Sequence, residues 1–242
     1  MFLKASSLVT GGFVILPLLL AAGFIVACEW AGRRLGEGVT VRRRRAMRVG
    51  SAVLAWLMVT ALIAASGVLR QLDATPPPLA VLALAVGVIG IAVPCSSLGT
   101  LLVRGLPLWV LVGFQVFRLP LELVMHRAYV EGVMPVQMSY SGQNFDILSG
   151  ITAGVLGLWL GHGRVPRWVV ASWNMLGFVL LVKIVTIAIL STPLFRWFGD
   201  DRLNIFVTYP PFVWLPAILV TAALMGHILV WRRWSEKPVA EV

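Results

Sequence analysis

Four polar side chains lie within a stretch of sequence that is otherwise apolar enough to cross a membrane. Between Leu106 and Val130 these are Gln115, Arg118, Glu122 and His126. Their spacing of three, four and four residues places all four side chains on one face of a helix. Charged groups are costly in hydrocarbon unless they pair or line a cavity, so this face is a candidate functional site.

Arg118 and Glu122 are the two charged members of this face, and their four-residue spacing favours an internal ion pair. We therefore expect them to form one coupled unit directed at the interior of a helix bundle. Pro120 lies between them and cannot donate to the carbonyl of Val116, so a kink is also expected here. Two interpretations stay open: a water-accessible pocket, or a polar clasp between helices.

The loop after this segment, Glu131–Asp146, carries further polar groups close to His126. Among them, Asn144 and Asp146 are candidate ligand-binding residues. Asp146 also directly precedes an apolar segment that starts at Ile147, which is the position of a helix N-cap residue. Both roles for Asp146 are compatible with the sequence.

A later apolar segment contributes Asn174 and Lys183. We expect Asn174 to make an interhelical hydrogen bond, whereas Lys183 either extends to the membrane surface or neutralises Glu122 or a bound anion. The complete predicted ligand-binding set is Gln115, Arg118, Glu122, His126, Asn144, Asp146 and Lys183.

A metal site is the alternative for part of this set. Glu122 and His126 have a spacing suited to two metal ligands on one helix, and Asp146 would complete the site. The three histidines are not expected to meet, because His126 is predicted near the outer surface and His162 and His227 near the inner one. No particular cofactor follows from the sequence, and whether the protein is an enzyme stays open.

The chain that carries these residues has 242 residues, of which 59% are hydrophobic and only 12% charged. A soluble domain of this size cannot bury so much apolar surface, so we predict an all-α polytopic transmembrane bundle forming one integral-membrane domain over residues 1–242. Seven spans are predicted, the fifth short enough to be re-entrant: Leu8–Trp30, Gly50–Leu69, Leu79–Leu102, Leu106–Val130, Ile147–Leu160, Trp168–Leu190 and Pro211–Trp231.

The net charge of +10 is distributed as expected for a membrane protein rather than a nucleic-acid-binding protein. Thirteen Lys and Arg residues fall in one set of loops and ends, including Arg33, Arg34, the run Arg42–Arg45 and Lys237, and five in the other, including Lys4. This bias predicts an extracytoplasmic N-terminus and a cytoplasmic C-terminus in a bacterial inner membrane. The two cysteines, Cys28 and Cys95, are interpreted as small apolar fillers.

Parts of the sequence resemble a group of small multispan bacterial inner-membrane proteins to which no activity is assigned. The residues that carry this resemblance are Glu122, His126, Asn144-Phe145-Asp146, Trp173-Asn174, Trp214-Leu215-Pro216 and His227. The resemblance implies the multispan architecture and no particular chemistry.

Three functions are compatible with these observations. The first is binding or transport of a small polar, anionic or amphiphilic ligand in an outward-facing intramembrane pocket. The second is a membrane enzyme, either a metal-assisted hydrolase or a transferase, that acts on lipid. The third is an accessory or assembly subunit. The lipid bilayer is the one partner that all three share. A membrane-protein partner or a homo-oligomer is also possible, and a stable protein partner would favour the third function.

Overall fold

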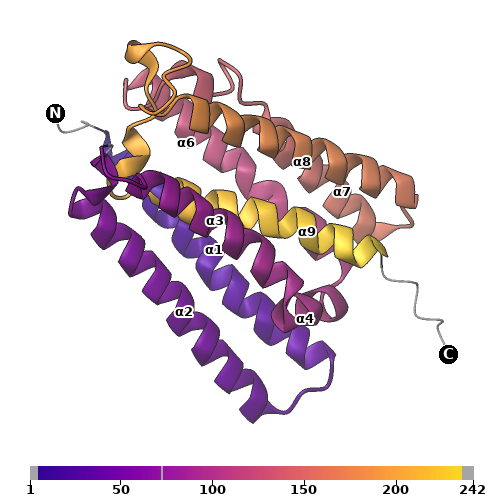
Figure 1. Ribbon diagram of the computed structural model, residues 1–242. Coiled ribbons are helices and arrows are strands. Elements are labelled where there is room, and N and C mark those ends of the chain that lie inside the picture. Colours follow the sequence, from indigo (N-terminus) through magenta and orange to yellow (C-terminus); the bar gives the residue numbers. More distant parts are fainter. Residues whose placement is uncertain (1–4, 72, 236–242) are drawn as a thin grey trace.

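The computed structural model describes residues 5–71 and 73–235, and over these residues it contains helices, turns and loops but no strand. Six helical segments are long and apolar enough to cross a membrane, so the protein is a multi-pass helical membrane protein (Figure 1). The main helices are α1 (Ser7–Arg34), α2 (Val39–Ala65), α3 (Pro78–Cys95), α4 (Ser97–Gly105), α5 (Leu108–Gly113), α6 (Arg118–Val130), α7 (Asp146–His162), α8 (Arg167–Leu190) and α9 (Thr221–Ser235).

The second helix begins earlier than predicted, at Val39 rather than at Gly50. Arginine has a high helix propensity, so the basic run Arg42–Arg45 extends the helix and is not a loop. Arg45 also binds Glu37 in the turn before α2, with a nitrogen-to-oxygen distance of 2.6 Å. Two of the lysines counted in the predicted charge bias, Lys4 and Lys237, lie outside the described residues.

The predicted span Leu79–Leu102 is divided into two helices. α3 ends at Cys95, and the side chain of Ser96 accepts a hydrogen bond of 3.1 Å from the Leu98 amide to begin α4. Arg232 of α9 donates to the carbonyl of Pro94, which compensates one backbone acceptor at this break.

The segment with the predicted polar face is one span, Leu108–Val130, but it is not one regular helix. Between α5 and α6 lies a 3₁₀ turn, η2 (Phe114–Phe117). This turn directly precedes the first turn of α6, where Pro120 lacks a backbone donor, so an irregularity occurs where the proline predicts one.

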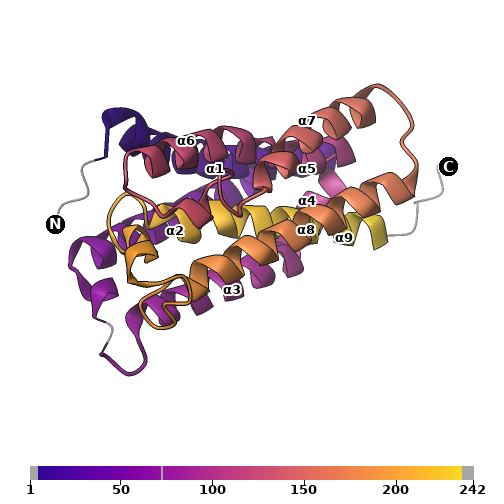
Figure 2. The same ribbon diagram turned by 90° about the horizontal axis from the view of Figure 1, so that it is seen from above.

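The fifth predicted span is α7, whose 17 residues make it shorter than the six membrane-spanning candidates. Its first residue, Asp146, contacts Arg118, the first residue of α6. Because α6 rises about 1.5 Å per residue, roughly 18 Å along the bundle separates Arg118 from Val130. Residues 131–145 therefore return over the length of α6, and α6 and α7 occupy different ends of the bundle (Figure 2).

This returning loop is packed inside the protein, since Val133, Met134, Met138 and Asn144 are buried. Non-helical backbone is tolerated at membrane depth when protein covers it. The start of α1 and the end of α9 lie at opposite ends of the bundle, and the returning loop is at the same end as the start of α1 (Figures 1 and 2).

Candidate functional site

Arg118 is the centre of a buried polar network that links α6, α7, α8 and α9. Its side chain is 2% exposed, and it donates to the carboxylate of Asp146 through one terminal nitrogen. Its other terminal nitrogen lies 2.9 Å from Nε2 of His227. A guanidinium only donates, so Nε2 of His227 is the acceptor and Nδ1 carries the proton. That Nδ1 donates to Asn174 Oδ1 at 2.9 Å, and Asn174 Nδ2 donates to the His227 carbonyl at 3.1 Å.

Glu122 belongs to a second set of bonds, centred on Asn144. Asn144 Nδ2 donates to Glu122 Oε1 at 2.7 Å and to the Met138 carbonyl at 3.1 Å. Asn144 Oδ1 accepts from the Asp146 amide at 3.1 Å. Asn144 thereby ties the carboxylate of Glu122 to the first turn of α7.

The predicted pairing of Arg118 with Glu122 is wrong, because a carboxylate from another segment takes that position. The returning loop brings Asp146 against Arg118, while Glu122 binds the Asn144 amide. Asp146 is also not the N-cap residue of α7, a position that Phe145 occupies without a side-chain capping bond. The sequence could not show this, since the pairing depends on how far the loop returns into the bundle.

The other two members of the predicted face have separate roles. Gln115 is fully buried and donates to the carbonyl of Ala223 in α9 at 2.9 Å. His126 lies near the hydroxyl groups of Ser139 and Ser141, each 3.1 Å from its Nδ1. His126 is therefore held by the returning loop and is not part of the Arg118 network.

Lys183 is also apart from this network. Its ammonium group lies 4.3 Å from the centre of the Phe145 ring, a cation–π contact. Of the seven predicted ligand-binding residues, the structure brings together Arg118, Glu122, Asn144 and Asp146.

His227 is the residue of the network that sequence reasoning misplaced, since it was expected near the inner surface. α9 continues to Ser235, which puts His227 about 12 Å from the end of the helix. Gly177 of α8 leaves room for its ring, because a Cβ at Gly177 would lie 2.6 Å from His227 Cε1. A glycine three residues after Asn174, on the same helix face, was the available signal.

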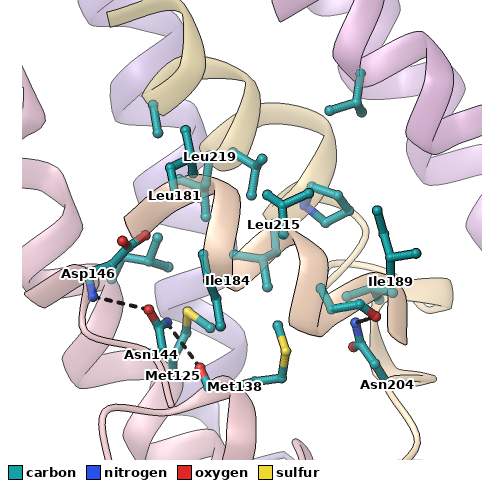
Figure 3. A pocket seen from close by; sticks show the side chains of 18 of the residues that line it. Met125, Met138, Asn144, Asp146, Leu181, Ile184, Ile189, Asn204, Leu215 and Leu219 are labelled. Carbon is teal, nitrogen blue, oxygen red and sulfur yellow. Dashed lines mark hydrogen bonds between the residues drawn. The ribbon is translucent and has the colours of Figure 1, made fainter. Parts of the chain in front are cut away.

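The network closes one end of a pocket of about 180 Å³. Figure 3 shows Asp146 and Asn144 at one side of this pocket. Apolar side chains from α8 and from the segment that directly precedes α9 line the pocket next to them. The polar lining at this end comes from Arg118, Glu122, Asn144 and Asp146. Asn204, on the opposite side in Figure 3, and Thr192 are also polar, and most of the rest is aliphatic. A π-helical turn, η6 (Leu215–Val220), forms part of the apolar wall.

The pocket has an apolar rim formed by α3 and α8. Ala83 of α3 and Ile189 of α8 both line the pocket and are exposed on the outside of the bundle, Ile189 by 42%. Neighbouring side chains on the same helices, such as Leu84 and Val182, are exposed apolar groups of the kind that face lipid. The pocket therefore has a polar inner end and an apolar side that reaches the bundle surface.

A second pocket, of about 450 Å³, lies between α1, α2, α3 and α9. Its lining is apolar except for Thr221 and the indole of Trp56, so it lacks a charged end. Of these two pockets, the first is the one lined by charged residues of the network.

Among the described residues, no three His, Cys, Asp or Glu side chains come together as a metal site. The three residues of the predicted metal alternative have different neighbours: Asn144 for Glu122, loop serines for His126, and Arg118 for Asp146.

Fold and site together define a helical integral membrane protein with a buried ionic network beside a mostly apolar pocket. Comparisons with protein-family models, with curated proteins and with solved structures found no match. The functional argument therefore depends on the geometry of the site.

Proposed function

We propose that this protein binds, and in its cellular role carries or presents, an amphiphile whose polar end lies at the Arg118–Asp146–Glu122–Asn144 network. The observation that supports this is the combination, in one pocket, of a charged inner end and aliphatic walls that reach the lipid-facing surface. Ligand pockets commonly combine apolar walls with a few convergent polar groups. An apolar chain lying between α3 and α8 would enter from the bilayer.

The size of the pocket favours a ligand that is only partly enclosed. Pockets that surround a whole drug-sized ligand have about 300–1,000 Å³, whereas this one has about 180 Å³. A polar head group and the first part of a chain would be inside, and the remaining chain would lie along the exposed faces near Ala83 and Ile189.

We also propose a bacterial inner-membrane location with seven membrane segments, the fifth formed by α7 together with the returning loop. Support comes from the position of most basic residues at the end of the bundle opposite the start of α1, which would place the N-terminus outside. In a background lacking Cys28 and Cys95, Asp201→Cys should then react with an impermeant maleimide in intact cells. Gly36→Cys should react only after lysis, and the reverse pattern would contradict this topology.

The binding proposal is tested by filling the pocket. Ala188 lines the pocket and is half-buried, so Ala188→Phe should obstruct it. Val182 on the same helix is 48% exposed and lines neither pocket, so Val182→Phe is a matched control. Native mass spectrometry of the purified protein should show a retained amphiphile in the wild type and the control and its loss in Ala188→Phe. Equal retention in both variants would argue against binding in this pocket.

A further inference from the structure

The polar end of the pocket has hydrogen-bond acceptors to spare. Taken as whole residues, Glu122 is 1% exposed and Asp146 is 6% exposed, and both line the pocket. Within the described part of the chain, neither Glu122 Oε2 nor Asp146 Oδ1 has a hydrogen-bond partner. Two buried carboxylate oxygens without partners are costly, and a donor from a ligand would satisfy them.

The positive charge of the site is already engaged. Each terminal nitrogen of Arg118 makes one bond, one to Asp146 and the other to His227, so the positive charge of Arg118 is already paired with a buried carboxylate. Lys183 does not line the pocket and lies against the Phe145 ring instead. Two carboxyl groups of the pocket therefore share one arginine, and His227 adds no positive charge because its Nε2 accepts from Arg118.

We infer that the head group bound at this site is a hydrogen-bond donor, and preferably an ammonium group, rather than an anion. This inference rests on the proposed amphiphile-binding function. The sequence left a polar, anionic or amphiphilic ligand open, and this inference selects against the anionic one. An ammonium head supplies several donors and one positive charge, which matches the two acceptor oxygens without partners and the two carboxyl groups that share one arginine. A hydroxyl head supplies a single donor and would bind more weakly.

The test compares three photoreactive hexadecyl probes that differ only in their head group: an amine, an alcohol and a carboxylic acid. The protein is reconstituted in phosphatidylcholine nanodiscs, and crosslinks on α8 are mapped by mass spectrometry. Labelling of the pocket-facing Ile184 is divided by labelling of the lipid-facing Val182, which corrects for the different partitioning of the probes.

We expect this ratio to be about tenfold higher for the amine than for the acid, because a charge-assisted bond contributes about 1.5–3 kcal/mol and 1.4 kcal/mol corresponds to a factor of ten. Glu122→Gln should remove most of that preference, whereas Glu131→Gln, outside the pocket, should preserve it. The wild-type comparison of the three probes stands by itself if Glu122→Gln fails to fold.

The outcomes separate this inference from the proposed function. Pocket labelling that is equal for all three probes, or stronger for the acid, would overturn the donor head group and leave amphiphile binding intact. The same holds if Glu122→Gln folds and keeps the full amine preference. No enrichment of any probe at Ile184 over Val182 would overturn both proposals.

Discussion

Removing either partner of the buried ion pair between Arg118 and Asp146 should strongly destabilise the protein, and a double-mutant cycle measures the coupling between the two residues. Both side chains are buried, at 2% and 9% exposure, so solvent does not screen their interaction. Removing one partner of a buried pair typically costs about 3–5 kcal/mol because the other charge is left uncompensated. Arg118→Met and Asp146→Asn should therefore each destabilise the protein by roughly this amount in an unfolding titration from detergent micelles.

The double variant should lose clearly less than the sum of the two changes, with a coupling energy of about 2–3 kcal/mol. Recovery will be incomplete, because His227 Nε2 loses its donor whenever Arg118 is replaced. The parallel cycle of Arg118→Met with Glu122→Gln should give a coupling well below this, since Glu122 bonds to Asn144. Additive effects for Asp146, or a larger coupling for Glu122, would refute the arrangement of charges described above.

Two further outcomes are expected. In a thermal unfolding assay, Gly177→Ala should destabilise the protein by about 1–3 kcal/mol, since the added Cβ would meet the hydrogen-bonded ring of His227. Gly87→Ala is the control: a Cβ there has nothing within 4 Å, so this change should be neutral or stabilising. Similar effects of the two changes would contradict the packing of His227 against Gly177. A hydrogen bond from the Ser6 amide holds the pKa of Glu131 below its usual 4.5. The ionised carboxylate therefore stabilises the fold at pH values above the unfolded-state pKa, and this stabilisation is lost as the pH falls through the lower pKa of the folded state. Melting temperature should accordingly decline on acidification below about pH 4.5, less steeply in Glu131→Gln, and an unchanged slope in that variant would count against the contact.

Sequence reasoning was most successful where hydropathy alone decides the structure. Long apolar runs such as Trp168–Leu190 correspond closely to helices, here α8 (Arg167–Leu190), because lipid leaves the backbone few alternatives to helix formation. The ends were less predictable where a helix extends into charged sequence, as α2 does through Arg42–Arg45.

The site was predicted in part, for a physical reason that applies to many membrane proteins. Local spacing identified Arg118 and Glu122 as residues of a buried face, and both are buried. Spacing along one helix could not reveal that Asp146 would reach Arg118, because that contact depends on a loop that folds back into the bundle. The same applies to His227, whose partner lies 109 positions away in the sequence.

The central claim, that an amphiphile occupies the pocket between α3 and α8, is tested most directly by saturation of photolabelling in the wild-type protein. A photoreactive hexadecylamine probe is titrated into nanodiscs with and without an excess of unlabelled hexadecylamine, and crosslinks are quantified at each position of α8. We predict that labelling at Ile184 and Ala188, which line the pocket, saturates and is displaced by the unlabelled amine, while labelling at the lipid-facing Val179 and Val182 rises linearly and is not displaced. Linear, undisplaced labelling at all four positions would contradict the claim.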